Sequence, residues 1–264
     1  MEGRMEDRMI VVTGGGSGIG KATALLCAEK LGARLAVLDV NEAAARDVAE
    51  EALSSGAPRA LGVGCDVTRE NEVEKAFELC TAELGAPDGV FANAGIDIGG
   101  LEHELSYETW DRVLSTNLSG VFLTCKHALR AMLEAGKGGS IVCTSSPSAS
   151  VALAAGGTGA YSASKGGVSA LVRCLAIDYA RNSIRVNAVV PGATETPLMW
   201  VNVPEDEREQ MREQINDEVP LGRLADPVEI GQAVVWLLSD ASAYVTGSHL
   251  VCDGGILAKG SISV

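Results

Sequence analysis

Residues 9–26 read MIVVTGGGSGIGKATALL, and this stretch decides the fold. The apolar run at its start predicts a short buried strand, and a helical pattern follows over about residues 19–31. Between them lies a turn rich in glycine, residues 13–20. Glycines let the backbone turn tightly and approach a pyrophosphate, and the start of the helix offers free N–H groups and a partial positive charge. A strand, a glycine-rich turn and a helix in this order predict a dinucleotide site.

The alternation of strand and helix patterns continues along the chain, with no linker between them. Further strands are predicted at residues 34–38, 59–65, 89–92, 139–145, 184–190 and 248–252. Further helices are predicted after a cap at Asn41, from a cap at Thr68 to Leu84, and over residues 109–134, 161–181, 206–217 and 227–238, the last started by Asp226 and Pro227. We therefore expect the α/β class: a single-domain, Rossmann-like, doubly wound parallel sheet with helices on both faces. The domain would span residues 1–264, with a tail at 1–8 and a mobile substrate-loop region at 194–220.

Composition and charge narrow the class of protein. The 264-residue chain has a net charge of −14 and no evident basic patch, which argues against nucleic acid or an anionic membrane surface as a partner. None of the seven cysteines forms a C-x-x-C motif, a pattern typical of reduced core thiols in a cytoplasmic protein. The three histidines are scattered, so no metal site is expected, and no apolar run is long enough to span a membrane.

Asp39 ends the second predicted strand, 19 residues after Gly20. A carboxylate at this place accepts hydrogen bonds from the adenosine ribose hydroxyls and repels a 2′-phosphate. No Lys or Arg occurs in residues 40–45, so the sequence favours NAD over NADP as cofactor. The alternative is that Asp39 is only a helix cap. A P-loop interpretation of residues 15–21 is disfavoured because Ala22 stands where a Mg²⁺-binding hydroxyl is needed.

Tyr161 and Lys165 stand four residues apart in AYSASKGG, within a predicted helix. Positions i and i+4 share one face of a helix, so the phenol and the ammonium would project into the same space. The ammonium would stabilise the phenolate and lower the tyrosine pKa from its usual ~10 toward neutrality. The pair predicts an acid/base pair for proton transfer.

Together, TGGGSGIG at 13–20, NAG at 93–95, YSASK at 161–165 and PG at 191–192 resemble the short-chain dehydrogenase/reductase family. The glycine spacing, G-x-x-x-G-x-G, is the form that this family uses, and the resemblance covers residues 9–255. It implies a Rossmann-like fold and a homotetramer packed through long helices. It also implies cofactor contacts from Gly14, Gly16, Ser17, Gly18, Ile19, Gly20, Asp39, Asp66, Val67, Asn93, Ala94, Gly95, Tyr161, Lys165, Pro191, Gly192, Thr194 and Thr196.

The resemblance further implies a catalytic set of Asn117, Ser146, Tyr161 and Lys165. Tyr161 would be the base in alcohol oxidation and the acid in ketone reduction. Ser146 would donate a hydrogen bond to the substrate oxygen, and Asn117 would position water leading from Lys165 to solvent. Counting back from Tyr161 by the usual family spacing gives Ser148 instead of Ser146, and both serines remain open.

These observations predict an NAD-dependent oxidoreductase that interconverts a secondary alcohol and a ketone. One alternative is an NADPH-linked 3-oxoacyl carrier-protein reductase of the same family, and another is a non-catalytic nucleotide-sensing protein on this fold. Specificity is expected to lie in residues 96–106, 148–159 and 194–220. The small apolar side chains of the last two segments, and the lack of a cationic clamp, predict a neutral and largely apolar small-molecule substrate.

Overall fold

The computed structural model of the chain describes residues 8–152 and 156–259. The strands are β1 Met9–Thr13, β2 Arg34–Asp39, β3 Ala60–Gly64, β4 Gly89–Ala92, β5 Gly139–Thr144, β6 Ile184–Pro191 and β7 His249–Cys252. The helices are α1 Gly18–Leu31, α2 Glu42–Ser54, α3 Glu70–Leu84, α4 Tyr107–Leu114, α5 Gly120–Ala135, α6 Gly159–Tyr179, α7 Arg208–Glu218 and α8 Pro227–Leu238. Most of the predicted tail, and the apolar residues 153–155 of the expected substrate segment, lie outside the described residues.

All seven strands form one parallel sheet in the order β3-β2-β1-β4-β5-β6-β7. This confirms the predicted doubly wound α/β fold. The strand order reverses between β1 and β4, and ligands of such sheets bind outside the carboxyl ends of the strands at this reversal. The glycine-rich turn follows β1, so it lies at this point.

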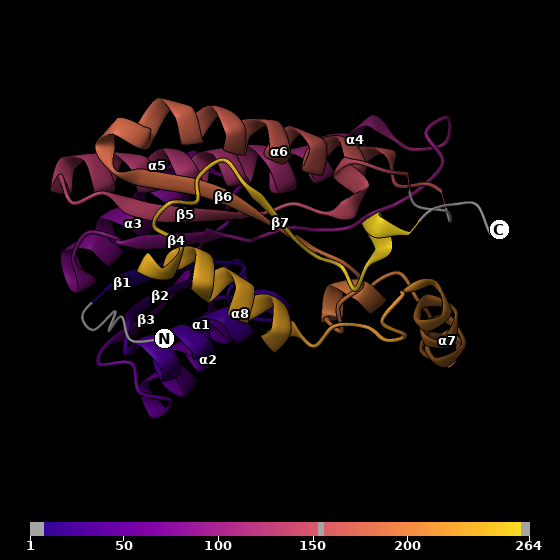
Figure 1. The fold of residues 1–264 in the computed structure, drawn as a ribbon, viewed down its shortest axis with the longest axis horizontal. Helices are drawn as coiled ribbons and strands as arrows, with labels where there is room; N and C mark the ends of the chain where they lie inside the picture. Colours follow the sequence, from indigo (N-terminus) through magenta and orange to yellow (C-terminus); the bar gives the residue numbers. More distant parts are fainter. Residues whose placement is uncertain (1–7, 153–155, 260–264) are drawn as a thin grey trace.

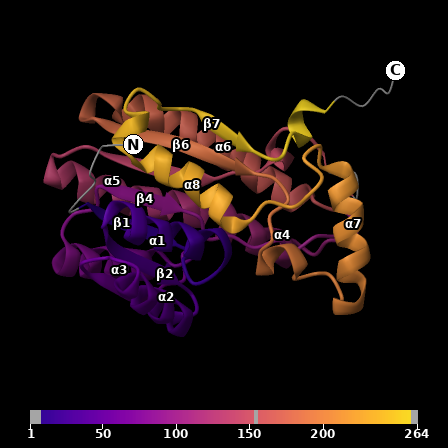
Figure 2. The ribbon, with the colours of Figure 1, turned by 60° about the horizontal axis from the view of Figure 1, so that its bottom comes forward.

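Helices cover the sheet on both faces, as Figures 1 and 2 show. Successive strand residues point to opposite faces. Ile10 and Val12 of β1 therefore join a core with α1, α2 and α8, whereas Met9 and Val11 join a second core with α3, α5 and α6. Both cores are built mainly from aliphatic side chains, and Phe91 of β4 is fully buried in the first of them.

One helix prediction needs correction and another gains a detail. Thr68 does not cap α3: the helix begins at Glu70 after Arg69, and the Thr68 N–H and hydroxyl both donate to Asp66 Oδ1, at 2.9 and 2.7 Å. The long helix predicted at 109–134 is present as a helical run over α4 and α5, joined by a π-helical turn at Ser115–Ser119. By contrast, the Asn41 side chain accepts from the Ala44 N–H, as its predicted cap role requires.

The segment after β6 leaves the sheet and passes beyond the carboxyl ends of the strands, where α7 lies (Figures 1 and 2). It begins with a short 3₁₀ turn, Pro197–Trp200, and returns to the body of the protein where Thr194 and Ala225 pair as a parallel β-bridge. Helix α7, Arg208–Glu218, lies within two residues of the bounds of the charged helix predicted at 206–217. We call residues 194–225 the cap segment. Its mobility stays a prediction.

Candidate functional site

The glycine-rich turn is packed too closely for side chains. Gly14 has a left-handed backbone, φ 62°, and a Cβ there would lie 2.8 Å from the Cα of Ala94. A Cβ on Gly20 would lie 2.1 Å from the carbonyl oxygen of Gly14. Contacts this short exclude any side chain, so these glycines keep the backbone of the turn pressed against the ends of β1 and β4. The glycines are thus explained in part by internal packing.

The start of α1 can hold an anion. Ser17, the N-cap residue, makes no side-chain cap hydrogen bond, and the first turn contains no acidic residue. The unpaired N–H groups of the first turn and the helix dipole therefore favour a negatively charged ligand such as a pyrophosphate. Gly18 lies beside this start, and a Cβ there would lie 3.2 Å from Thr196 of the cap segment. The cap segment thus reaches the glycine-rich turn.

Asp39 lies at the end of β2 against the glycine-rich turn. Its Oδ2 accepts from the Gly16 N–H and its Oδ1 accepts from the Asn41 N–H, both at 2.9 Å. Asn41, and not Asp39, caps α2. The carboxylate keeps further acceptor positions, because an ionised carboxylate offers about four. These features fit the ribose end of a dinucleotide, with the pyrophosphate at α1.

Asn93 joins the ends of three strands. Its Nδ2 donates to the carbonyl oxygens of Thr13 and Gly14, each at 3.3 Å, and its Oδ1 accepts from the Thr144 hydroxyl at 3.1 Å. After β3, the Val67 side chain is buried and faces Gly120 of α5, so it is part of the core. The cofactor contact expected of Val67 stays a prediction.

The residues after β6 form the opposite wall. Gly192 lies so close to Asp253 that a Cβ would be 2.6 Å from the Asp253 Cα. The Thr194 hydroxyl donates to the Gly192 carbonyl at 3.0 Å, and the Thr196 hydroxyl accepts from the Met199 N–H at 3.3 Å. Pro191 ends the strand itself. These contacts fix the backbone where the nicotinamide end of a dinucleotide would lie.

Tyr161 and Lys165 share one face of α6, as their spacing predicts. The Lys165 Nζ lies 5.5 Å from the centre of the Tyr161 ring and donates to the Thr144 carbonyl at 2.9 Å. The lysine side chain is buried and the tyrosine is half-buried. A phenol and an ammonium thus meet at the carboxyl end of the sheet.

The pKa of Tyr161 lies above its ordinary value in this structure, opposite to the direction predicted, and the stabilisation of the phenolate by Lys165 stays a prediction. Burial, and to a smaller extent the negative charge of Asp97, raise the pKa of Tyr161 to about 12, and a hydrogen bond with Ser146 opposes this rise. Burial lowers the pKa of Lys165 to about 8. The ammonium lies over the ring and donates to the Thr144 carbonyl.

Of the two serines left open by the sequence, Ser146 is the one hydrogen-bonded to Tyr161. Ser148 is buried behind it, and the Ser148 hydroxyl donates to the Ser146 Oγ at 2.9 Å. Ser146 begins the short 3₁₀ turn Pro147–Ala149 directly after β5. Ser148 therefore orients the hydroxyl of Ser146.

Asn117 lies in the π-helical turn between α4 and α5, and its side chain is fully buried. Its Nδ2 donates to the Ile96 carbonyl and its Oδ1 accepts from the Ile96 N–H, both at 2.8 Å. The same Nδ2 lies 3.3 Å from the Ser164 hydroxyl. The amide thus holds the segment after β4 in place. Its predicted role in positioning water stays a prediction.

Asp97 is a site residue that the sequence analysis did not single out. It lies two residues after the NAG motif, is half-buried, and its charge acts on both Tyr161 and Lys165. Burial raises the pKa of this carboxyl, and Lys165 opposes that rise. The sequence signal for it was its place in residues 96–106, a segment expected to set specificity.

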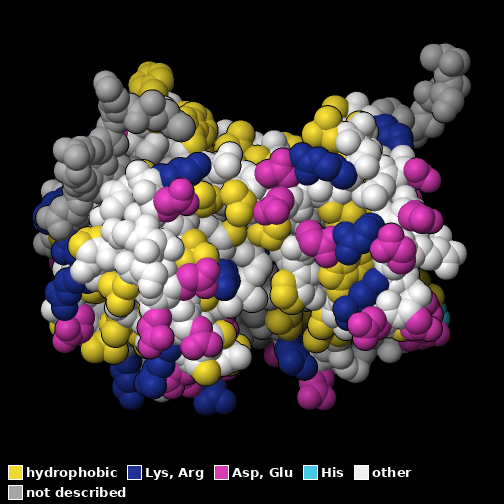
Figure 3. Space-filling view, turned by 90° about the horizontal axis from the view of Figure 1, so that it is seen from below, with side chains coloured by type: hydrophobic (Ala, Val, Ile, Leu, Met, Phe, Trp, Pro, Cys, Tyr) yellow, Lys and Arg dark blue, Asp and Glu magenta, His cyan; other side chains and the backbone are white. Residues whose placement is uncertain are grey.

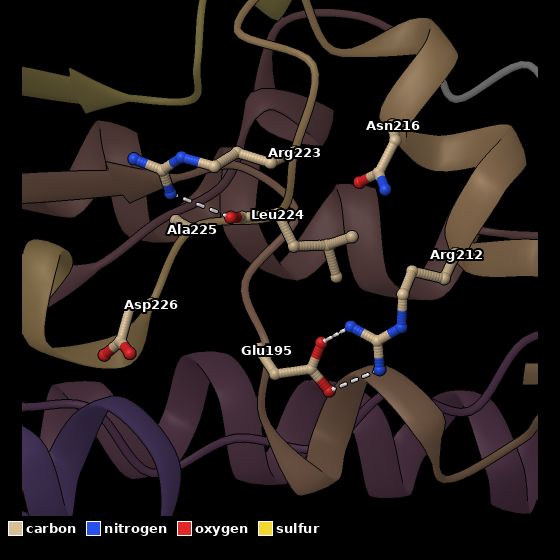
Figure 4. Close-up of a pocket in the computed structure, with 7 residues that line it drawn as sticks. All are labelled: Glu195, Arg212, Asn216, Arg223, Leu224, Ala225 and Asp226. Atoms are coloured by element: carbon tan, nitrogen blue, oxygen red, sulfur yellow. Dashed lines mark hydrogen bonds and ion pairs between the residues drawn. The ribbon is translucent and has the colours of Figure 1, made fainter. Parts of the chain in front are cut away.

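A hollow of about 240 Å³ is lined by side chains of α7 and of the cap segment, together with Asp226 (Figure 4). At its wall the guanidinium of Arg212 binds both oxygens of Glu195. The Trp200 indole N–H also donates to Glu195 Oε1, at 2.6 Å. The Arg212 guanidinium also stacks 5.0 Å from the Trp200 ring. These contacts join α7 to the start of the cap segment, and they leave Arg212 neutralised.

On the face seen in Figure 3, Lys and Arg side chains are interspersed with Asp and Glu. Across residues 8–152 and 156–259, no cluster of His, Cys, Asp and Glu is arranged to hold a metal ion. Within the same ranges no helix is long and apolar enough to cross a membrane. All seven cysteines are free, and five of them are buried.

Comparison with known proteins gives a consistent result. A family model described as enoyl-(acyl carrier protein) reductase matches residues 14–257. The cis-4-hydroxycyclohexanecarboxylate dehydrogenase of Sinomonas cyclohexanicum is 44% identical over 96% of this chain and 97% of its own length. The 2,5-dichloro-2,5-cyclohexadiene-1,4-diol dehydrogenase of Sphingobium indicum is 39% identical, over 96% and 98%.

Among solved structures, a short-chain type dehydrogenase/reductase from Mycobacterium marinum superposes with a TM-score of 0.90 at 35% identity, and the match covers 96% of both chains. The sequence motifs, the doubly wound sheet and these matches over nearly the whole chain agree. The chain belongs to the short-chain dehydrogenase/reductase family.

Proposed function

We propose that this protein is an NAD-dependent dehydrogenase that interconverts a secondary alcohol and a ketone, with Tyr161 as acid/base. The observation that carries the proposal is the meeting of Ser146, Tyr161 and Lys165 beside the glycine-rich turn. A bound nicotinamide supplies the hydride acceptor in oxidation and the hydride donor in reduction. The similar dehydrogenases named above act on ring alcohols by their names, which supports the same reaction type here.

The residues divide the chemistry between them. Ser146 donates a hydrogen bond to the substrate oxygen, and Tyr161 takes the hydroxyl proton or returns it. Because burial raises the pKa of Tyr161 to about 12, the neutral phenol is a ready acid for reduction, and oxidation should accelerate as pH rises. The ammonium of Lys165, which donates to the Thr144 carbonyl, supplies a positive charge to the site.

The preference for NAD is proposed on the charge of Asp39. The carboxylate is held by Gly16 and Asn41 at the ribose end of the site, and residues 40–45 contain no cation to neutralise it or a 2′-phosphate. The acyl carrier-protein reductase alternative has less support, because a chain with a net charge of −14 would repel an acidic carrier protein.

The test is a spectrophotometric assay of the purified protein with NAD⁺ or NADP⁺ and a panel of secondary alcohols, and with the matching ketones and reduced cofactors. We expect turnover of neutral ring alcohols with NAD⁺. Absence of turnover with every alcohol and ketone would contradict the reaction type. Equal kcat/KM for the two cofactors would contradict the cofactor assignment alone.

A further inference from the structure

The segment after β4 is held rigidly over the proposed catalytic residues. Asn117 binds both the N–H and the carbonyl of Ile96 at 2.8 Å. The Asn202 Nδ2, from the cap segment, donates to the backbone carbonyl of Asp97 at 3.0 Å, and the Gly100 N–H donates to the Gly157 carbonyl at 2.8 Å. All three segments expected to set specificity therefore meet at residues 96–100, which holds the backbone at Asp97 in place.

The Asp97 carboxylate has an unusual environment for a charged group. It is half-buried, and across the described parts of the chain its side chain forms no hydrogen bond and no ion pair. The nearby ammonium of Lys165 is already held by the Thr144 carbonyl. A partly buried carboxylate without donors loses hydration that nothing in the chain replaces, so a ligand that brings a donor would be favoured.

We propose that Asp97 determines substrate specificity by accepting a hydrogen bond from a second hydroxyl of the substrate, whose first hydroxyl lies at Tyr161 and Ser146. The substrate class is then a neutral diol or polyol, and anionic alcohols are repelled. This inference rests on the proposed function and sharpens it. The substrate pocket was predicted to be largely apolar, and Asp97 adds one hydrogen-bond acceptor to it. The carboxylate can accept but not donate, so a hydroxyl suits it better than a ketone or ether oxygen.

The test compares the wild type with Asp97→Asn, which keeps the size of the side chain and the backbone contact to Asn202. Glu104→Gln is the matched control: it makes the same change of charge in the same loop, and its side chain is exposed. For each protein kcat/KM is measured with NAD⁺ and with cyclohexanol, the isomeric cyclohexanediols, a hydroxycyclohexanecarboxylate and an aminocyclohexanol. Thermal stabilisation by the best diol, with NAD⁺ present, is measured in parallel.

We expect the wild type to prefer at least one diol over cyclohexanol, and Asp97→Asn to lower that preference by ~10-fold or more, equivalent to ~1.4 kcal/mol. The same variant should gain activity on the carboxylate, whereas Glu104→Gln should change neither ratio. Unchanged ratios in Asp97→Asn would overturn the inference, and so would a stronger preference for the aminocyclohexanol than for any diol. If no alcohol is oxidised but diol stabilisation still depends on Asp97, the proposed reaction fails and the specificity role stands. If neither is seen, both fail.

Discussion

Replacing Asp39 by asparagine isolates the charge that we hold responsible for the preference for NAD. Asp39 accepts hydrogen bonds from the N–H groups of Gly16 and Asn41. Asparagine has nearly the same size and keeps one acceptor oxygen, so the glycine-rich turn should retain most of its support. Alanine would remove the charge and the support together, and its effect on either cofactor could not be assigned to one cause.

The size of the effect follows from Coulomb's law. A like charge acts strongly over ~4 to ~6 Å, and at ~5 Å each unit of phosphate charge costs between ~1 and ~3 kcal/mol for effective dielectric constants from ~80 to ~20. A 2′-phosphate carries more than one unit of charge, so ~2 kcal/mol is a cautious total, or ~30-fold in kcat/KM. The ribose hydroxyls of NAD exchange a charged acceptor for a neutral one, which weakens NAD use by ~1 kcal/mol.

The assay is kcat/KM for NAD⁺ and NADP⁺ at a fixed, saturating alcohol, in the wild type, Asp39→Asn and Asp47→Asn. Asp47 is exposed on α2 and provides the same change of charge away from the turn. The NADP-to-NAD ratio should rise by ~30-fold or more in Asp39→Asn and stay constant in Asp47→Asn. Added salt should narrow the preference of the wild type, because screening weakens repulsion between partly exposed charges. A ratio that does not change in Asp39→Asn would refute the electrostatic argument.

Three further predictions test other parts of the protein. Tyr161→Phe should lower kcat by ~100-fold or more, because proton transfer is lost, while NADH binding measured by fluorescence stays unchanged; substantial residual turnover would remove Tyr161 from its assigned role. Asp97→Asn should move the pH dependence of alcohol oxidation to lower pH, since the carboxylate raises the pKa of Tyr161, and a profile that stays in place or moves to higher pH would argue against that contact. Phe91→Ala should lower the free energy of unfolding by ~3 to ~5 kcal/mol in urea titrations, because the ring is fully buried in the core with α1, α2 and α8, and a loss below ~1 kcal/mol would mean that this core tolerates a large cavity.

The fold was predictable because its signals are local. Apolar runs with turn residues at each end mark buried parallel strands, and all seven predicted strands are present within a few residues of their expected bounds. Asn41 and Asp226 cap their helices as predicted, since a cap depends only on the next few residues. Thr68 failed as a cap because Asp66, two residues earlier, takes its N–H and its hydroxyl. The π-helical turn that contains Asn117 could not be predicted, because the pattern of apolar residues there is that of an ordinary α-helix.

The chemistry of the site was less predictable because it depends on partners far apart in the sequence. Glu195 and Asp97 are both acidic residues in segments that follow a strand, and nothing local distinguishes them. Arg212, 17 residues further on, neutralises Glu195 together with the Trp200 N–H, so Glu195 serves to hold the cap segment. Asp97 receives no such partner within the described residues, although its backbone is tied to Asn202, 105 residues away. The Glu195 carboxylate therefore stabilises the cap segment, whereas we infer that the Asp97 carboxylate binds the substrate. This difference follows from the fold and not from residue type.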